Sequence, residues 1–315
     1  MHTLEDIKTG MLKHATHLDI SENLTTFPSQ IFGLADTLEA LDLSGNQIAV
    51  IPADIAELQQ LKVLDLSCNQ LTELPEALGE LKQLQKLVVR SNQLKRLPES
   101  LSQCRMLQSI SIADNQFSEL PAELDNLPKL AWLTFSENPC SAPVDFSEID
   151  CPKQCVIDQD TELALQADSH EFLGKPSPKS ARDTFADDFM LTVDAAHKIV
   201  LSIAAILSNL SQQSLSHGAV HAHTILSNPE ADIILSGFAA LSQYQGYPAA
   251  QANSIQAIEV RAFGCLLEDL LGSSYDSEEN EELFEPMVLL KNRCMHPKPA
   301  ARPKLTEIYT ELNSL

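Results

Sequence analysis

Three histidines in one short stretch are the residues of this chain whose types and spacing could do chemistry. His217, His221 and His223 stand in the sequence HGAVHAH. Neutral imidazole is a frequent zinc ligand, so an HxxxHxH cluster could hold a metal ion. The alternative is that these histidines are structural. A Ser-His-Asp triad would need an activated serine, and the sequence contains no GxSxG nucleophile elbow. We expect no metal and no triad.

A second group of residues could bind rather than react. It is a basic stretch with Glu99 as its one acidic neighbour, and it consists of Lys82, Lys86, Arg90, Lys95, Arg96 and Arg105. The chain as a whole carries a net charge of −23, so a local excess of positive charge is notable. Trp132 is the single tryptophan. Aromatic and arginine side chains dominate the binding energy of protein interfaces, which indicates a protein partner with an acidic surface.

The elements that must position these residues follow from a repeat of 23 residues. Asparagines mark it, at Asn23, Asn46, Asn69, Asn92, Asn115 and Asn138. Leucine and isoleucine keep the same spacing, in the pattern LxxLxLxxNxLxxLPxxLxxL. This pattern resembles the leucine-rich repeat proteins, whose repeats are 20–29 residues long. The resemblance implies an α/β horseshoe in which LxL is a short strand, a ladder of asparagines bonds to backbone groups, and LPxxLxxL is a helical or 3₁₀ segment on the convex side.

The outward residues of such strands line a concave face, where repeat proteins usually bind. Successive repeats place His17, Ala40, Val63, Lys86, Ser109 and Trp132 in one column. The next outward column contains Asp19, Asp42, Asp65, Val88, Ser111 and Thr134. A third column, two residues further on, contains Ser21, Ser44, Ser67, Arg90, Ala113 and Ser136. The predicted partner-binding residues come from these three columns and are Lys86, Val88, Arg90, Ser109, Trp132 and Thr134. The alternative is that the aspartates reflect common LDLS usage and that the basic stretch is a solvated convex surface.

Length and composition suggest more than one domain. The repeats cover residues 1–140, a proline-broken linker covers 141–193, and a mainly α-helical domain covers 194–315. The acidic balance argues against nucleic acid and anionic membranes as partners. The N-terminus lacks the apolar core of a secretory signal, and the most apolar later stretch, Ile199 to Leu207, is too short to cross a bilayer. We expect a cytoplasmic protein. Cys140, Cys151 and Cys155 could be reduced, bridged or metal-bound.

The second half contains, in order, HGAVHAHTIL, IILSGFAALS, EVRAFGCLLEDLL and a final segment with Arg302-Pro303. This order resembles the C-terminal lobe of a protein kinase, with its HRDLxxxN loop, DFG segment, buried DVWSFG helix and closing DPxxRP segment. The whole chain is similar to a bacterial family of leucine-rich-repeat proteins with a C-terminal kinase-like domain. On this resemblance, His217 matches the buried histidine of the HRD-type motif.

The resemblance also implies that the chemistry of a kinase is lost. The catalytic base position is Ala219, the metal-binding asparagine position is Thr224, and the metal-binding aspartate position is Gly237. Residues 141–193 contain no glycine-rich loop and no VAIK lysine, so the N-terminal lobe is missing. We therefore predict a binding or scaffold protein that carries a pseudokinase-like lobe, is not an enzyme and needs neither ATP nor Mg²⁺. The alternative is residual nucleotide binding or kinase-related activity.

Overall fold

The computed structural model describes most of the chain. The described residues are 2–141, 179–180, 191–227, 233–235, 241–274 and 281–315. The chain divides into two compact units, Met1–Ala142 and Pro143–Leu315. The first contains the 23-residue repeats and the second contains the long α-helices.

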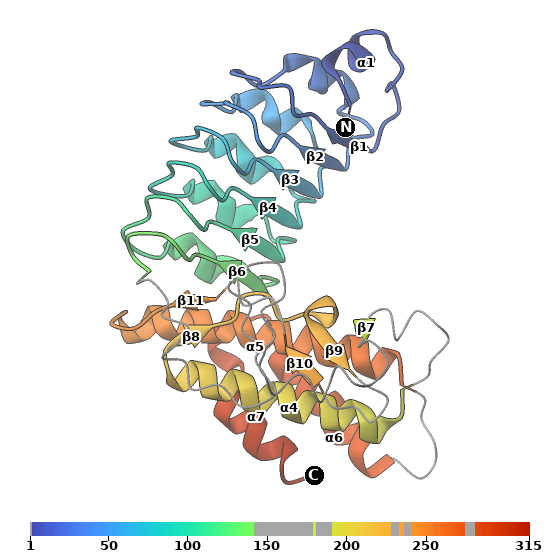
Figure 1. The fold of residues 1–315 in the computed structure, drawn as a ribbon, viewed down its shortest axis with the longest axis vertical. Helices are drawn as coiled ribbons and strands as arrows, with labels where there is room; N and C mark the ends of the chain where they lie inside the picture. Colours follow the sequence, from blue (N-terminus) through green and yellow to red (C-terminus); the bar gives the residue numbers. More distant parts are fainter. Residues whose placement is uncertain (1, 142–178, 181–190, 228–232, 236–240, 275–280) are drawn as a thin grey trace. The chain divides into compact units, whose positions relative to one another are not determined.

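The repeat unit is built on a parallel sheet whose six strands lie in sequence order (Figure 1). The strands are β1 (His17–Asp19), β2 (Ala40–Asp42), β3 (Val63–Asp65), β4 (Lys86–Val88), β5 (Ser109–Ser111) and β6 (Trp132–Thr134). Each begins 23 residues after the one before and pairs with it without a shift in register. The middle residue of every strand is buried, as Leu64 and Leu87 illustrate. The first and third residues point to the opposite side. Together with the residue two positions after each strand, such as the exposed Arg90 after β4, they make up what we call the strand face.

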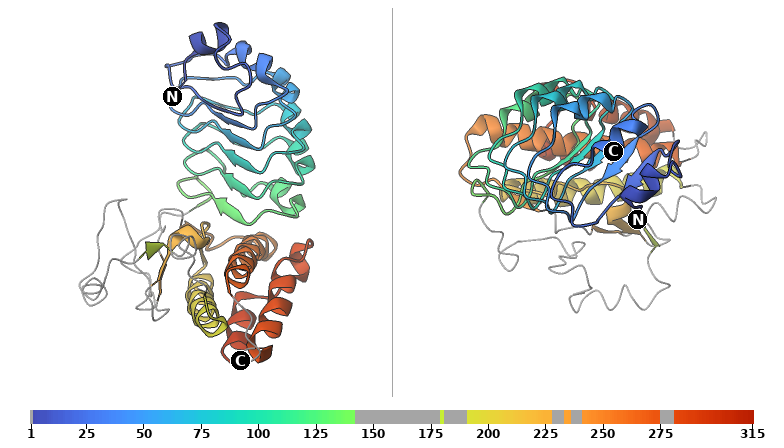
Figure 2. Two further views of the ribbon diagram at one scale, coloured as in Figure 1. Left: turned by 90° about the vertical axis from the view of Figure 1, so that its right-hand side faces the viewer. Right: turned by 90° about the horizontal axis from the view of Figure 1, so that it is seen from above.

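The chain returns between strands through short 3₁₀ helices on the other side of the unit (Figure 2). They are η1 (Ser29–Leu34), η2 (Ala53–Glu57), η3 (Glu76–Glu80), η4 (Glu99–Gln103) and η5 (Ala122–Asn126). A proline precedes each of them, in the extended conformation that its ring favours. Of the two conformations that the LPxxLxxL pattern left open, the structure has the 3₁₀ helix.

The asparagine ladder ties each repeat to the one before it. Asn92 accepts a hydrogen bond at Oδ1 from the backbone N–H of Leu71 (2.9 Å). Its Nδ2 donates to the carbonyls of Leu66 (3.0 Å) and Val89 (3.1 Å). Asn69 and Asn115 make the same set of bonds one repeat away, and all three are buried. These side chains satisfy backbone groups that the turn would otherwise bury without partners.

Asn23 is not part of this ladder, and the expectation of six equivalent asparagines was wrong. Its side chain is exposed and its backbone has φ +55°. In later repeats that left-handed conformation belongs to the residue before the ladder asparagine, such as Gly45 or Ser91. The first repeat is one residue shorter here, so Asn23 occupies the turn itself. Asn46 consequently bonds to the N–H of Leu24 instead of a residue one place further along.

The N-terminal segment covers the edge of β1. The backbone N–H of His2 donates to the carbonyl of Asp19 (2.6 Å). Helix α1 (Leu4–Lys8) follows, with a capping box between Thr3 and Asp6. The helix ends at Lys8; Gly10 has φ +75° and the chain continues through turns.

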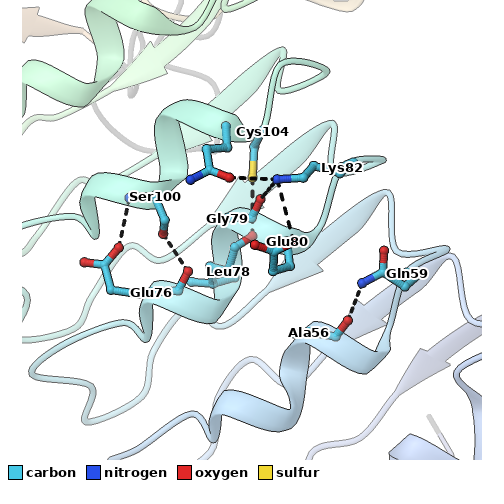
Figure 3. A network of polar contacts seen from close by, with 10 residues as sticks. Ala56, Gln59, Glu76, Leu78, Gly79, Glu80, Lys82, Ser100 and Cys104 are labelled. Atoms are coloured by element: carbon cyan, nitrogen blue, oxygen red, sulfur yellow. Dashed lines mark hydrogen bonds and ion pairs between the residues drawn. The ribbon is translucent and has the colours of Figure 1, made fainter.

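The 3₁₀ helices of neighbouring repeats pack through a polar network (Figure 3). The hydroxyl of Ser100 donates to the carbonyl of Glu76 (2.6 Å), and the backbone N–H of Ser100 donates to the Glu76 carboxylate (2.9 Å). The thiol of Cys104 donates to the carbonyl of Leu78 (3.3 Å). Burial raises the pKa of Cys104 to about 11, so this thiol stays protonated and unreactive at neutral pH. Gly79 lies against Ser100 in the same contact.

The second unit is mainly helical, as expected. Its helices are α4 (Val193–Gln212), α5 (Ala249–Gly272), α6 (Glu281–Cys294) and α7 (Leu305–Leu312), with η8 (Ala222–Thr224) and η10 (Pro299–Ala301) between them. Helix α4 packs against α5, α6 and α7. Its inward side chains, including Ile203 and Leu207, are fully buried. In the part of the chain that the structure describes, α4 is the one helix both long and apolar enough to cross a membrane by length and composition alone. The nine-residue estimate for its apolar stretch was therefore too short.

Short strands accompany the helices. β8 (Leu215–Ser216) pairs with β11 (Ser242–Gln243), and β9 (Ile225–Ser227) pairs with β10 (Ile233–Leu235). β7 (Lys179–Ser180) adds to β9. The sequence predicted residues 141–193 as linker, but Lys179–Ser180 form a strand because they pair with Leu226 and Ser227. Cys151 and Cys155 lie outside the described residues.

Replacing a ladder asparagine tests its structural role. We expect Asn92→Ala to lower the free energy of unfolding of the repeat unit by about 2–4 kcal/mol, because several buried backbone groups lose their partners together. Asn23→Gly is the matched control, since that side chain is exposed and glycine suits its positive φ. Urea unfolding followed by Trp132 fluorescence measures both variants. Equal stability for Asn92→Ala and wild type would refute the ladder's contribution.

Gly79 tests the contact between η3 and η4. A Cβ at this position would lie 2.5 Å from both the Cβ and the carbonyl oxygen of Ser100. Gly79→Ala is expected to cost about 1–3 kcal/mol, because backbone as well as side chain must shift. Gly33→Ala serves as the control, since its Cβ would meet no atom within 4 Å. A Gly79→Ala protein as stable as Gly33→Ala would show that the two 3₁₀ helices are not tightly packed.

Candidate functional site

The predicted partner-binding residues lie together on the strand face of β4 to β6. Lys86, Ser109 and Trp132 are Cα partners across the three strands. The next outward row joins Val88 of β4 to Thr134 of β6 through Ser111. The hydroxyl of Thr134 donates to the hydroxyl of Ser111 (2.7 Å), which fixes both side chains. The repeat spacing therefore assembles one surface from residues 46 positions apart in the chain.

Lys86 and Arg90 supply positive charge that the described residues do not neutralise. Both side chains are exposed, and neither forms an ion pair within the described part of the chain. Lys62, one repeat earlier, differs because its ammonium lies 2.8 Å from the Glu39 carboxylate. The charge at Lys86 and Arg90 is consequently available to a binding partner.

The strand face changes sign along the array. Asp42 and Asp65 occupy on β2 and β3 the position that Val88 has on β4. One oxygen of Asp42 accepts the N–H of Ser44 (2.8 Å), and one oxygen of Asp65 accepts both the N–H and the hydroxyl of Ser67. These aspartates thus stabilise the turns after their strands. They also make the face acidic over β1–β3 and basic over β4.

The six bases of the basic stretch do not form one surface. Lys82 lies on the 3₁₀ side, where its ammonium donates to the carbonyl of Gly79 and to Gln103 of η4 (Figure 3). Lys95 and Arg96 lie between Asn92 and η4, and Arg105 follows η4. The six basic residues occupy different positions within the 23-residue repeat, and only those at the strand positions, or two positions after a strand, lie on the strand face. The basic part of the strand face consists of Lys86 and Arg90.

Comparison with known proteins agrees with this geometry. Residues 36–142 match the family model described as leucine-rich repeat region. This segment is a leucine-rich repeat region. It comprises β2–β6 and η2–η5 and thus contains every predicted partner-binding residue. A comparison with curated proteins finds no match.

Two solved structures are similar to part of the chain. One is a leucine-rich repeat protein of Leptospira interrogans, with 29% identity, a TM-score of 0.37, and coverage of 44% of this chain and 42% of that one. The other is the leucine-rich-repeat ectodomain of the receptor kinase SOBIR1 from Arabidopsis thaliana. It has 33% identity, a TM-score of 0.34, and coverage of 38% of this chain and 69% of that one. The chain thus spans less than half of the Leptospira protein.

The histidine cluster is spread over different environments in the helical unit. His217 is fully buried and His221 is partly buried, whereas the side chain of His223 lies outside what the structure describes. Among the described residues, no three His, Cys, Asp or Glu side chains gather where they could hold a metal ion. Thr224 donates its hydroxyl to the carbonyls of His221 (2.8 Å) and Ala219 (3.0 Å), so this hydroxyl stabilises its own turn. Gly237 lies outside the described residues.

A buried acid at the centre of the helical unit was not singled out as a functional candidate from the sequence. Glu259 of α5 is only 3% exposed. Its Oε1 accepts the backbone N–H groups of His217 (2.6 Å) and Gly218 (3.2 Å). Desolvation raises the pKa of this carboxyl to about 7, although the hydrogen bonds oppose the shift. Two charged residues, Glu259 and Arg261, stand among the apolar residues of the run EVRAFGCLL, and this was the signal that could have revealed it.

Two arginines join α5 to the segment after α6. Arg261 donates to the carbonyl of Met295 (2.7 Å), and Arg302 donates to the carbonyls of His296 (2.9 Å) and Ala257 (2.7 Å). Both arginines are buried. Cationic donors suit the carbonyls at the C-terminal end of a helix, so these contacts fix the end of α6. Arg261, Arg302 and Glu259 therefore have a structural role, because their side chains bond to backbone groups within this unit.

Glu259 should give the helical unit a characteristic pH dependence. An unfolded glutamate titrates near 4.5 and the folded one near 7, so the folded unit binds the proton more tightly between these values. The free energy of unfolding is therefore expected to fall, by up to a few kilocalories per mole, as pH rises from about 4.5 to about 7. Denaturant unfolding followed by circular dichroism at pH 5 and pH 8 measures this change.

Glu259→Gln is expected to flatten that profile because it removes the titrating group. Glu268→Gln is the control, since Glu268 lies on the same helix but is largely exposed, 3.6 Å from Lys291. If Glu259→Gln retained the wild-type slope between pH 4.5 and 7, another group would control the titration.

Proposed function

We propose that this chain binds another protein through the strand face of its leucine-rich repeat region. Leucine-rich repeat proteins commonly mediate protein–protein interaction. The observation that carries the proposal here is the row in which exposed Lys86 stands in register with Ser109 and Trp132. It combines an unneutralised charge, which can attract an acidic partner, with a tryptophan, a residue type enriched in binding hot spots.

The proposed partner carries an acidic surface. Lys86 and Arg90 have no intramolecular carboxylate among the described residues, so a carboxylate of the partner would restore charge balance. The rest of the chain is strongly acidic, with a net charge of −23. That negative charge would repel an acidic partner from the other surfaces of the protein and so direct it to Lys86 and Arg90. For the same reason we propose no nucleic-acid or membrane partner. We also propose a role in the cytoplasm.

We further propose that the helical unit is a catalytically inactive, kinase-like lobe of a bacterial type. This proposal rests on the resemblance of its motifs. It also rests on the residues at the catalytic-base and metal-binding positions of a kinase, which here are Ala219, Thr224 and Gly237. The contact between Glu259 and His217 supports the proposal, because it joins the segment that resembles the HRD-type loop to the segment that resembles the buried helix of a kinase. No enzymatic role and no ATP or Mg²⁺ requirement are proposed. The rival function is residual nucleotide binding.

Charge reversal on the strand face tests the main proposal. The wild-type chain would be used to select from a displayed random peptide library, and we expect the enriched peptides to be acidic. Lys86→Glu/Arg90→Glu should weaken their binding at least tenfold, which corresponds to about 1.4 kcal/mol or more. The wild-type affinity should also fall as salt is raised from about 0.05 to 0.5 M, because exposed charges are screened.

Lys95→Glu/Arg96→Glu is the control, since it changes charge equally but outside the strand rows. It should leave binding of the selected peptides within about twofold of wild type. If the two double variants lose binding equally, net charge rather than the strand face is responsible, and the proposal fails. It also fails if the library yields no peptide that distinguishes wild type from Lys86→Glu/Arg90→Glu.

Nucleotide binding is tested separately by thermal unfolding with ATP and Mg²⁺. We expect no shift in melting temperature at millimolar ATP, because a ligand stabilises only a protein that binds it in the folded state. Mg²⁺ alone and ATP alone serve as controls. A stabilisation that requires both would favour the rival function.

A further inference from the structure

The strand face fixes not only the kind of partner but also the spacing of its side chains. Lys86 and Trp132 are two strands apart and in the same row. Neighbouring strands of a sheet are about 4.8 Å apart, so the two positions are separated by about 10 Å across the strands. A partner that engages both must therefore present its charged and apolar side chains at that distance.

Ser109 leaves the row between them open. Its side chain is short, only partly exposed, and makes no hydrogen bond within the described residues. A bound backbone could approach the sheet closely at this point and exchange a hydrogen bond with the hydroxyl. A bulky residue here would hold the partner away from both anchors. The row thus favours a ligand whose own backbone polar groups are accessible.

Backbone geometry selects among the possible ligand conformations. In a polyproline II helix, residues i and i+3 share a face and lie about 9.3 Å apart. In a β-strand, the same-face pairs i, i+2 and i, i+4 lie about 7 and 13 Å apart, which fits poorly. An α-helix matches this distance only at residues i and i+7, about 10.5 Å apart. Its backbone groups already bond to one another, so they could not form a hydrogen bond with the Ser109 hydroxyl.

We propose that the strand face recognises a polyproline II segment with a carboxylate and a large apolar side chain three residues apart. The carboxylate pairs with the Lys86 ammonium, the apolar side chain packs on the Trp132 indole, and the backbone between them passes over Ser109. This inference rests on the proposed function and specifies the partner of the same surface. Arg90 lies outside the row and supplies general attraction to acidic partners rather than the spacing.

Synthetic peptides of identical composition test the spacing. Each has a proline-rich background with one Glu and one Phe, separated by two, three or four positions, in both orders. Trp132 is the single tryptophan, so its fluorescence reports binding without a label. We expect the better order at spacing three to bind at least tenfold more tightly than spacings two and four.

Three variants assign that preference to the row. Lys86→Gln and Ser109→Leu should each reduce the spacing preference to less than about threefold. Lys95→Gln, a lysine outside the row, should retain it. An alanine-rich helical peptide with Glu and Phe seven positions apart is measured in parallel.

The outcomes separate this inference from the proposed function. Equal affinity at all three spacings, no saturable binding by any peptide, or tighter binding of the helical peptide would overturn the polyproline II inference. The proposed function would still stand if library-selected peptides depended on Lys86 and Arg90. It would fall only if that selection showed no such dependence.

Discussion

The need to satisfy buried backbone groups at each turn is the constraint on which the repeat unit depends. Every strand of the repeat unit is only three residues long, and the chain turns away soon after it. The buried asparagines supply the missing partners and link each repeat to its neighbour, as Asn92 does with Leu66 and Leu71. Leaving such groups unpaired would cost about 1–3 kcal/mol each. The same bonds fix the register, and the register places Lys86 beside Ser109 and Trp132.

The strand face can vary because it takes no part in this scaffold. The buried middle residues and the asparagines are nearly constant along the array, whereas the outward residues change from aspartate to lysine, valine, serine and tryptophan. Charge and aromatic character therefore accumulate at β4–β6 without cost to the core. In the helical unit the situation is reversed. Its polar residues, Glu259, Arg261 and Arg302, are buried and bonded to backbone, which makes them part of the scaffold.

The repeat fold could be predicted from the sequence because, with a strict period, residues 23 positions apart occupy equivalent places in neighbouring repeats. It predicted the strand rows and their register correctly. It failed where the period is broken, since Asn23 lost its place in the ladder through a single missing residue. It also failed where proximity in sequence was taken for proximity in space, as with Lys82, which lies on the 3₁₀ side. The helical unit has no period, so its short strands and the burial of Glu259 depend on contacts between distant segments that pattern alone does not specify.

The central claim is that binding takes place on the strand face at β4–β6. It is tested most directly by acetylation of lysine amines, read by mass spectrometry, in the presence and absence of a selected acidic peptide. The account predicts that the peptide slows modification of Lys86 severalfold and leaves Lys95 unchanged. Protection of Lys95 with Lys86 unaffected would contradict it, because the partner would then be bound outside the strand rows.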